Sequence, residues 1–126
     1  THTASQITGL ANVRFLNIGS SYSAPSNLSY LGVVVYCNAF VGLWTSGANV
    51  TYTVYAGGTN VGSITLNWRG QRTGGSGHGY YFSVGKLGYL AVNRTIGAGQ
   101  SIVVRRTSTA TNDNFAVDSE FCMIAC

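Results

Sequence analysis

The chain has 126 residues, a formal net charge of +4, 45% hydrophobic residues and only 8% charged residues. The length is that of one domain with one hydrophobic core. The hydrophobic fraction excludes intrinsic disorder, and the lack of any apolar run of about 20 residues predicts no membrane insertion. The 17 glycines and single proline are typical of an all-β domain rather than of a coiled coil or collagen.

In chain order, alternating and β-branched segments predict about eight short strands and no helix. The expected strands are residues 13–18, 31–44, 50–55, 61–68, 80–84, 87–92, 101–106 and 115–124. The clearest hairpin joins 50–55 to 61–68 through a turn at 56–60, with Ile64, Leu66 and Trp68 on one face. The pattern predicts an antiparallel β-sandwich or jelly roll over residues 11–126.

Several local patterns refine this prediction. Val33–Tyr36 is a continuous apolar run, typical of a strand that is buried on both faces. In the last strand, strict alternation places Phe115, Val117, Ser119, Phe121 and Met123 on one face, opposite Ala116, Asp118, Glu120, Cys122 and Ile124. Two segments are expected to be loops: the polar segment 20–29, and 69–79, which has five glycines in eleven residues.

The three cysteines do not form a disulfide framework or a zinc site. An odd number leaves at least one of Cys37, Cys122 and Cys126 unpaired within the chain. Cys37 lies in an apolar run and is expected in the core. Cys122 and Cys126 have no His or second Cys pair to complete a zinc set, so no metal and no other cofactor is expected.

The sequence also argues against an enzyme. The carboxylates are Asp113, Asp118 and Glu120, and the last two are expected to pair with neighbouring arginines on one solvated strand face. Neither His2 nor His78 is placed for a catalytic triad. The glycine loop lacks the Gly-Lys-Ser/Thr ending of a phosphate-binding loop.

The positive charge does not indicate a nucleic-acid partner. Seven basic residues are scattered along the chain, with no basic run and no known binding motif: Arg14, Arg69, Arg72, Lys86, Arg94, Arg105 and Arg106. The small surplus follows from the low number of acidic residues. We therefore expect no nucleic-acid partner.

The glycine loop with its aromatic flanks is the best candidate for a binding site. Glycine lets a backbone approach a partner closely, while aromatic rings and arginine offer flat faces and polar edges that suit sugars. The candidate ligand-binding residues are Trp68, Arg69, Arg72, His78, Tyr80 and Tyr81. Trp68, in phase with Ile64 and Leu66, suits the core better than the surface, and the whole loop also suits a simple long hairpin.

The opening segment Thr1–Leu10, THTASQITGL, closely resembles a segment of tailed-bacteriophage tail-fibre proteins that joins the shaft to a distal domain. The resemblance implies that residues 1–10 are a shaft-to-tip linker and that the rest is a homotrimeric receptor-binding tip in the virion. In such fibres a His-x-His pair binds a metal on the axis. Here only His2 of such a pair is present, so no metal is expected.

Three functions remain open at this point. The first is a fibre tip that attaches the virion to a bacterial surface glycan or outer-membrane protein, with the chain itself as its trimer partner. The second is a structural trimerisation or capping domain of a fibre, and the third is a secreted carbohydrate-binding lectin. The chain does not begin with Met, so it is expected to be a processed product or a piece of a longer protein.

Overall fold

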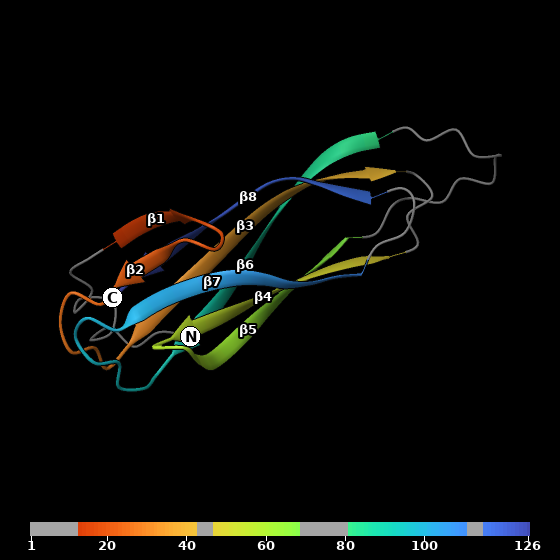
Figure 1. The fold of residues 1–126 in the computed structure, drawn as a ribbon. Helices are drawn as coiled ribbons and strands as arrows, with labels where there is room; N and C mark the ends of the chain where they lie inside the picture. The colour runs from red at the N-terminus through yellow and green to blue at the C-terminus, as the bar shows by residue number, and fades with distance from the viewer. Residues whose placement is uncertain (1–12, 43–46, 69–80, 111–114) are drawn as a thin grey trace.

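The computed structural model describes residues 13–42, 47–68, 81–110 and 115–126, and in these ranges the chain forms strands and no helix (Figure 1). The strands are β1 (Val13–Asn17), β2 (Ser21–Ser23), β3 (Leu31–Gly42), β4 (Ala48–Ala56), β5 (Thr59–Trp68), β6 (Tyr81–Val92), β7 (Ser101–Ala110) and β8 (Phe115–Ala125). The all-β prediction is confirmed.

The strands form two antiparallel sheets of four. The first sheet has the order β1-β8-β3-β6, and the second has the order β2-β7-β4-β5. Their inward side chains belong to one hydrophobic core, so the two sheets form two layers that are packed face to face. Figure 1 shows both layers as long, twisted ribbons that run along the molecule.

The predicted β4–β5 hairpin is confirmed. Its turn consists of Gly57 and Gly58, whose φ angles are 58° and 82°. Both values lie in the left-handed region that a type I′ hairpin turn requires, and glycine adopts this region without strain. In β5, Ile64, Leu66 and Trp68 are buried on one face, as their spacing predicts.

The prediction of two separate strands at 80–84 and 87–92 is wrong, because β6 is continuous from Tyr81 to Val92. The apparent break at Gly85 has a packing role. A Cβ on Gly85 would lie 2.6 Å from the Tyr36 hydroxyl and 2.9 Å from its ring. Gly85 therefore leaves room for an aromatic side chain of the neighbouring strand β3 and does not make a turn.

The prediction that residues 20–29 form a loop is also wrong in part. The segment contains β2, and its later residues are tied to the β6–β7 connection by backbone hydrogen bonds. Leu28 and Ile96 exchange two such bonds of 2.8 and 2.9 Å, and Ala24 N–H donates to Gln100 O at 2.9 Å. These bonds satisfy buried backbone groups at this end of the molecule.

The faces predicted for the last strand are wrong, because β8 contains a β-bulge. Ser119 is opposite Asn38 and Val117 is opposite Ala39, which leaves Asp118 as the extra residue. A bulge reverses the side-chain alternation beyond it. Phe115 before the bulge and Cys122 and Ile124 after it are therefore all buried.

The central strand β3 is buried fully on only one face. Val33, Val35 and Cys37 are completely buried between the sheets, which confirms the prediction for Cys37. Val34 and Tyr36, on the other face, remain partly exposed. The expectation that this run is buried on both faces is thus not met within one chain.

Two glycines allow the edge strands β5 and β6 to approach closely across the core. A Cβ on Gly88 would lie 2.3 Å from Ile64 Cγ2 and 2.7 Å from Leu66 Cδ2, and one on Gly62 would lie 2.7 Å from Leu90 Cδ2. Any larger side chain at Gly88 would push the two strands apart, because the β-branched Ile64 has little rotamer freedom with which to yield.

We predict that Gly88→Ala lowers the free energy of unfolding by about 1–3 kcal/mol, the usual cost of overpacking a core. Gly47→Ala is the matched control, because a Cβ there would meet no atom within 4 Å. Its effect should stay within about 0.5 kcal/mol. Urea denaturation measures both variants, and equal effects would contradict the close approach of β5 and β6.

Candidate functional site

Most of the predicted ligand-binding residues lie outside the described residues: Arg69, Arg72, His78 and Tyr80. Tyr81 is described only in its backbone, as the first residue of β6, opposite Gly42 on β3. The structure therefore gives the place at which this segment leaves and rejoins the fold.

Trp68 is a core residue. It is 1% exposed, its Nε1–H donates to Val84 O at 3.2 Å, and its ring lies 5.3 Å from that of Phe115. A buried indole whose donor is already used is not available to stack on a ligand. We therefore do not retain Trp68 as a ligand-binding residue, and its phase with Ile64 and Leu66 correctly indicates the core.

The predicted binding segment departs from one end of the molecule. At this end β3, β5 and β7 finish and β4, β6 and β8 begin, as the pairs Gly42–Tyr81, Ala48–Trp68 and Asn49–Ala110 show. The contact between Trp68 and Phe115 joins the two sheets there. At the opposite end, β1 begins at Val13, opposite Ala125 near the C-terminus, and Figure 1 shows the two ends far apart.

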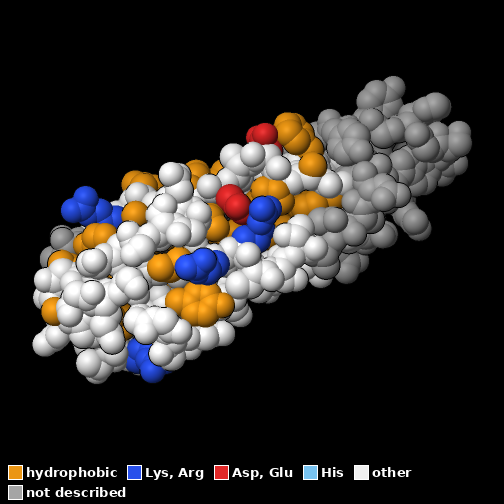
Figure 2. All heavy atoms as spheres, in the orientation of Figure 1, with side chains coloured by type: hydrophobic (Ala, Val, Ile, Leu, Met, Phe, Trp, Pro, Cys, Tyr) orange, Lys and Arg blue, Asp and Glu red, His pale blue; other side chains and the backbone are white. Residues whose placement is uncertain are grey.

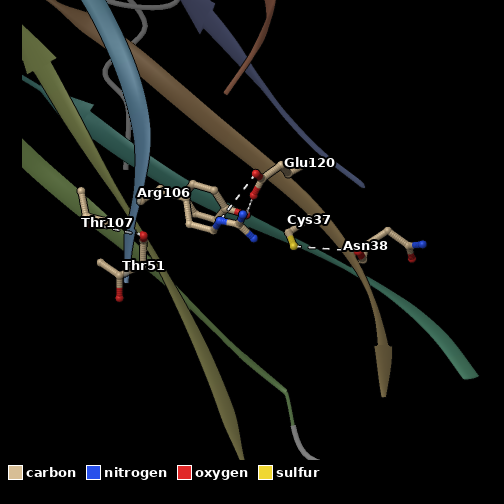
Figure 3. A network of polar contacts seen from close by, with 7 residues as sticks. Cys37, Asn38, Thr51, Arg106, Thr107 and Glu120 are labelled. Carbon is tan, nitrogen blue, oxygen red and sulfur yellow. Dashed lines mark hydrogen bonds and ion pairs between the residues drawn. The ribbon is translucent and has the colours of Figure 1, made fainter. Parts of the chain in front are cut away.

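Midway between these ends, a polar cluster crosses from one sheet to the other (Figure 3). The Tyr52 hydroxyl on β4 donates to Glu120 Oε2 on β8 at 2.5 Å, and Arg106 Nε on β7 lies 3.7 Å from Glu120 Oε1. Cys37 on β3 is in contact with the Tyr52 hydroxyl. The cluster therefore takes one residue from each of the four strands that lie centrally in the two sheets.

Strand register explains why these four residues meet. Cys37 is opposite Glu120 in the first sheet, and Tyr52 is opposite Arg106 in the second. The bulge at Asp118 turns Glu120 inward, and a second bulge at Thr107 lies next to Arg106. The sequence predicts an arginine partner for Glu120, but neither the inward position of Glu120 nor its bond to Tyr52.

The cluster closes an open edge between the sheets. β1 pairs with β8 only from Phe121 onward, and β2 pairs with β7 only as far as Val103. Beyond the ends of these short strands, solvent reaches Arg106 and Glu120, whose side chains are 37% and 19% exposed. In Figure 2 a basic and an acidic group lie side by side at mid-length on the visible face.

Burial favours the protonated forms of the Tyr52 hydroxyl and the Cys37 thiol in this cluster. Burial, the bond to Cys37 and the bond to Glu120 all raise the pKa of Tyr52 far above its usual value. The pKa of Cys37 is raised, because the effect of burial exceeds the lowering by its hydrogen bond with Tyr52. A protonated thiol is a poor nucleophile. The contacts of Glu120 with Tyr52 and Arg106 join the two sheets.

Further hydrogen bonds surround the cluster on the outer faces. On the first sheet, Asn38 Nδ2 donates to Asp118 Oδ2 at 3.0 Å, and Ser83 Oγ donates to Asn38 Oδ1 at 2.8 Å. On the second sheet, the hydroxyls of Thr53 and Thr107 lie 2.8 Å apart. Asp118 thus lies on the outside of the sheet, unlike Glu120, which contradicts the prediction that both share one face.

The described residues contain no group of three or more His, Cys, Asp or Glu side chains placed to hold a metal ion, and the three cysteines are free and buried. No helix among them has the length and apolar character needed to cross a membrane. Comparison of the chain with known protein families, curated proteins and solved structures finds no match.

We predict that Tyr52→Phe destabilises the protein more than Arg106→Ala does. Tyr52 donates a hydrogen bond to a charged group between the sheets, and loss of such a bond costs about 1.5–3 kcal/mol. Arg106 is partly exposed, so its ion pair contributes less than about 1 kcal/mol. Urea unfolding of the two variants tests this order, and a larger loss for Arg106→Ala would contradict it.

We also predict that the protein loses stability between about pH 9 and pH 11. Burial raises the pKa of Cys122 from 9.0 to about 11. The folded protein therefore holds this proton more tightly than the unfolded chain does. The resulting stabilisation is complete below pH 9 and is lost as the pH rises through the folded pKa. Urea midpoints across this range should fall less steeply in Cys122→Ala than in the wild-type protein, and equal slopes would contradict the assignment.

Proposed function

We propose that this chain is the receptor-binding tip of a tailed-phage tail fibre, a homotrimer in the virion that attaches to a bacterial surface glycan or outer-membrane protein. The observation that carries the proposal is the near-identity of Thr1–Leu10 to the shaft-to-tip linker of such fibres. A low charge and a fold built only of strands in the described residues suit an extracellular domain of this kind.

The arrangement of the two ends supports a distal binding surface. A linker at residues 1–10 leads into β1, which begins at the end of the sheets that also holds the last residue of β8, Ala125. The residues that flank the candidate loop 69–79 are Trp68, the last residue of β5, and the pair Tyr80 and Tyr81, of which Tyr81 begins β6 at the opposite end of the sheets. A shaft joined through the linker would therefore leave the second end free to face a cell.

We further infer that the two sheets form a jelly roll. Strand β1 pairs with β8, β2 with β7, β3 with β6, and β4 with β5. This set of pairs is what one long antiparallel hairpin gives when it is folded over into two layers, and eight strands in two packed sheets are typical of the jelly roll. The fold alone does not distinguish receptor binding from other functions.

Cell adsorption tests the proposal. Labelled protein should bind bacterial cells of a susceptible strain, and the variants Arg72→Ala and Tyr80→Ala should bind about five- to tenfold less, because a few side chains carry most of the energy of an interface. Arg105→Ala is the control, since Arg105 is exposed on the outer face of the second sheet. It should bind like the wild type.

Treatment of the cells separates the receptor classes. Loss of binding after removal of surface polysaccharide identifies a glycan, and loss after protease treatment identifies a protein. Binding by no strain in a broad panel would favour a structural fibre domain that does not contact the host. Normal binding by both loop variants would exclude segment 69–80 as the site.

A further inference from the structure

The outer face of the first sheet carries an apolar surface that extends across all four strands. One row of directly opposed, outward residues consists of Phe15 on β1, Met123 on β8, Val34 on β3 and Tyr89 on β6. Phe15 is 71% exposed and Tyr89 is 44% exposed. We call this row and the adjacent one the apolar face.

The adjacent row continues the apolar face with aromatic and aliphatic side chains. It contains Phe121 on β8, Tyr36 on β3 and Leu87 on β6, with Asn17 at its end on β1. Leu87 is 69% exposed. The ring centroid of Phe121 lies 5.0 Å from that of Tyr36 and 6.1 Å from that of Phe15, so the aromatic rings form a packed layer at the surface.

The charged residues that the structure describes lie outside the apolar face. Glu120 and Arg106 lie between the sheets, and Arg105 lies on the second sheet. Arg14 on β1 and Lys86 on β6 are opposite the inward residues Ile124 and Cys37, so neither is on the outer face. On the side toward the candidate binding segment, the polar group Asn38, Ser83 and Asp118 marks the limit of the face. An apolar centre with aromatic residues and Met, free of charge and bordered by polar groups, is typical of a protein–protein interface.

The outer face of the second sheet is different. Its outward positions on β4 and β5 carry mainly Asn, Thr and Ser, with Tyr55 next to the turn. Figure 2, in which β4, β5 and β7 face the viewer, shows a surface that is mostly uncharged and polar, with separate hydrophobic patches. The apolar surface is therefore specific to one sheet and does not reflect the low charge of the chain as a whole.

The area of the apolar face is sufficient for self-association. Four residues of the face, Phe15, Leu87, Tyr89 and Phe121, and the adjacent Val13 on β1, which is 56% exposed, together expose on the order of 600 Å². This is the upper limit of what a monomer usually leaves uncovered. Two such faces in contact would bury about 1,200 Å², which is the lower limit for stable interfaces. A second copy of this chain carries an apolar face of the same size and composition, so it is the partner that fits this surface.

We propose that copies of this chain associate through the apolar face. The contact completes the burial of β3, whose inward residues Val33 and Val35 are already covered by the second sheet. It covers Phe15 and Leu87, at the two edges of the first sheet, and leaves uncovered the far end of the sheets, where β5 ends at Trp68 and β6 begins at Tyr81. This association depends on the exposed apolar face and is independent of whether the chain binds a receptor.

Sedimentation velocity from about 1 to 100 μM tests the proposal. The wild-type chain should sediment as an oligomer, at two or more times the chain mass of 13.3 kDa. Leu87→Lys and Phe15→Lys should shift the oligomer toward monomer by at least tenfold in concentration, because each buries a charge in an apolar contact.

Ser63→Lys is the matched control. It adds the same charge at an exposed outward position of the other edge strand, β5, and should associate like the wild type. Thermal unfolding identifies any variant that is misfolded. Because the two lysine variants lie on different strands, one still tests the proposal if the other does not fold. A monomeric wild type at 100 μM would overturn the proposal, and so would association that both face variants leave unchanged.

Adsorption of the same variants separates this inference from the proposed function. If the face variants dissociate the oligomer but the wild-type protein binds no cells, the interface is supported and the receptor-binding function is contradicted. If both proposals hold, the dissociated variants should bind cells more weakly than the oligomer, because weak sites act together only when they are joined.

Discussion

Strand β3 runs through the middle of the first sheet with hydrophobic side chains on both of its faces, and this imposes the main constraint on the molecule. Its inward residues, from Val33 to Val41, pack against the second sheet and are almost completely buried. Its outward residues Val34 and Tyr36 have only neighbouring strands beside them. A strand of this composition is stable when both faces are covered, so burial in one chain satisfies only half of the requirement.

The two layers are held in register by a few specific polar contacts as well as by the core. Tyr52 and Glu120 join the central strands of the two sheets, and Arg106 closes the edge that the short β1 and β2 leave open. Nearer the C-terminus, Arg14 on β1 lies over the ring of Tyr22 on β2 at 5.7 Å and closes the same edge. In a chain with so few charged residues, these contacts set the relative position of the sheets where apolar packing alone would permit sliding.

Much of the fold could be predicted from the sequence, because strand signals are local. The β4–β5 hairpin follows from β-branched alternation and from two glycines that accept positive φ. The errors arose where tertiary packing overrides the local signal. Gly85 predicts a break in the strand, but it lies beneath Tyr36 in a continuous strand. The bulge at Asp118 reverses the faces of β8, and no local sequence signal predicts it. The Tyr52–Glu120 bond depends on that bulge, so the alternation pattern could not reveal it.

The proposed receptor binding and the proposed association involve different places on one scaffold. The residues that flank the predicted glycine-rich loop, Trp68 and Tyr81, lie at one end of the sheets, while the apolar face lies along the side of the first sheet, on the half toward Val13. The sequence pattern of Val33–Tyr36 predicts burial on both faces, and the single chain covers only one face of this run. This agreement between sequence pattern and exposed surface is the basis for proposing that copies of the chain complete the fold.

Hydroxyl-radical footprinting of the wild-type chain at low and high concentration tests whether copies of the chain cover the apolar face. Labelling of Phe15, Leu87 and Tyr89 should fall as the concentration rises, while labelling of Tyr55, on the outer face of the second sheet, should stay constant. Equal labelling of the apolar face at all concentrations would contradict this association. So would protection of Tyr55 in place of the apolar face.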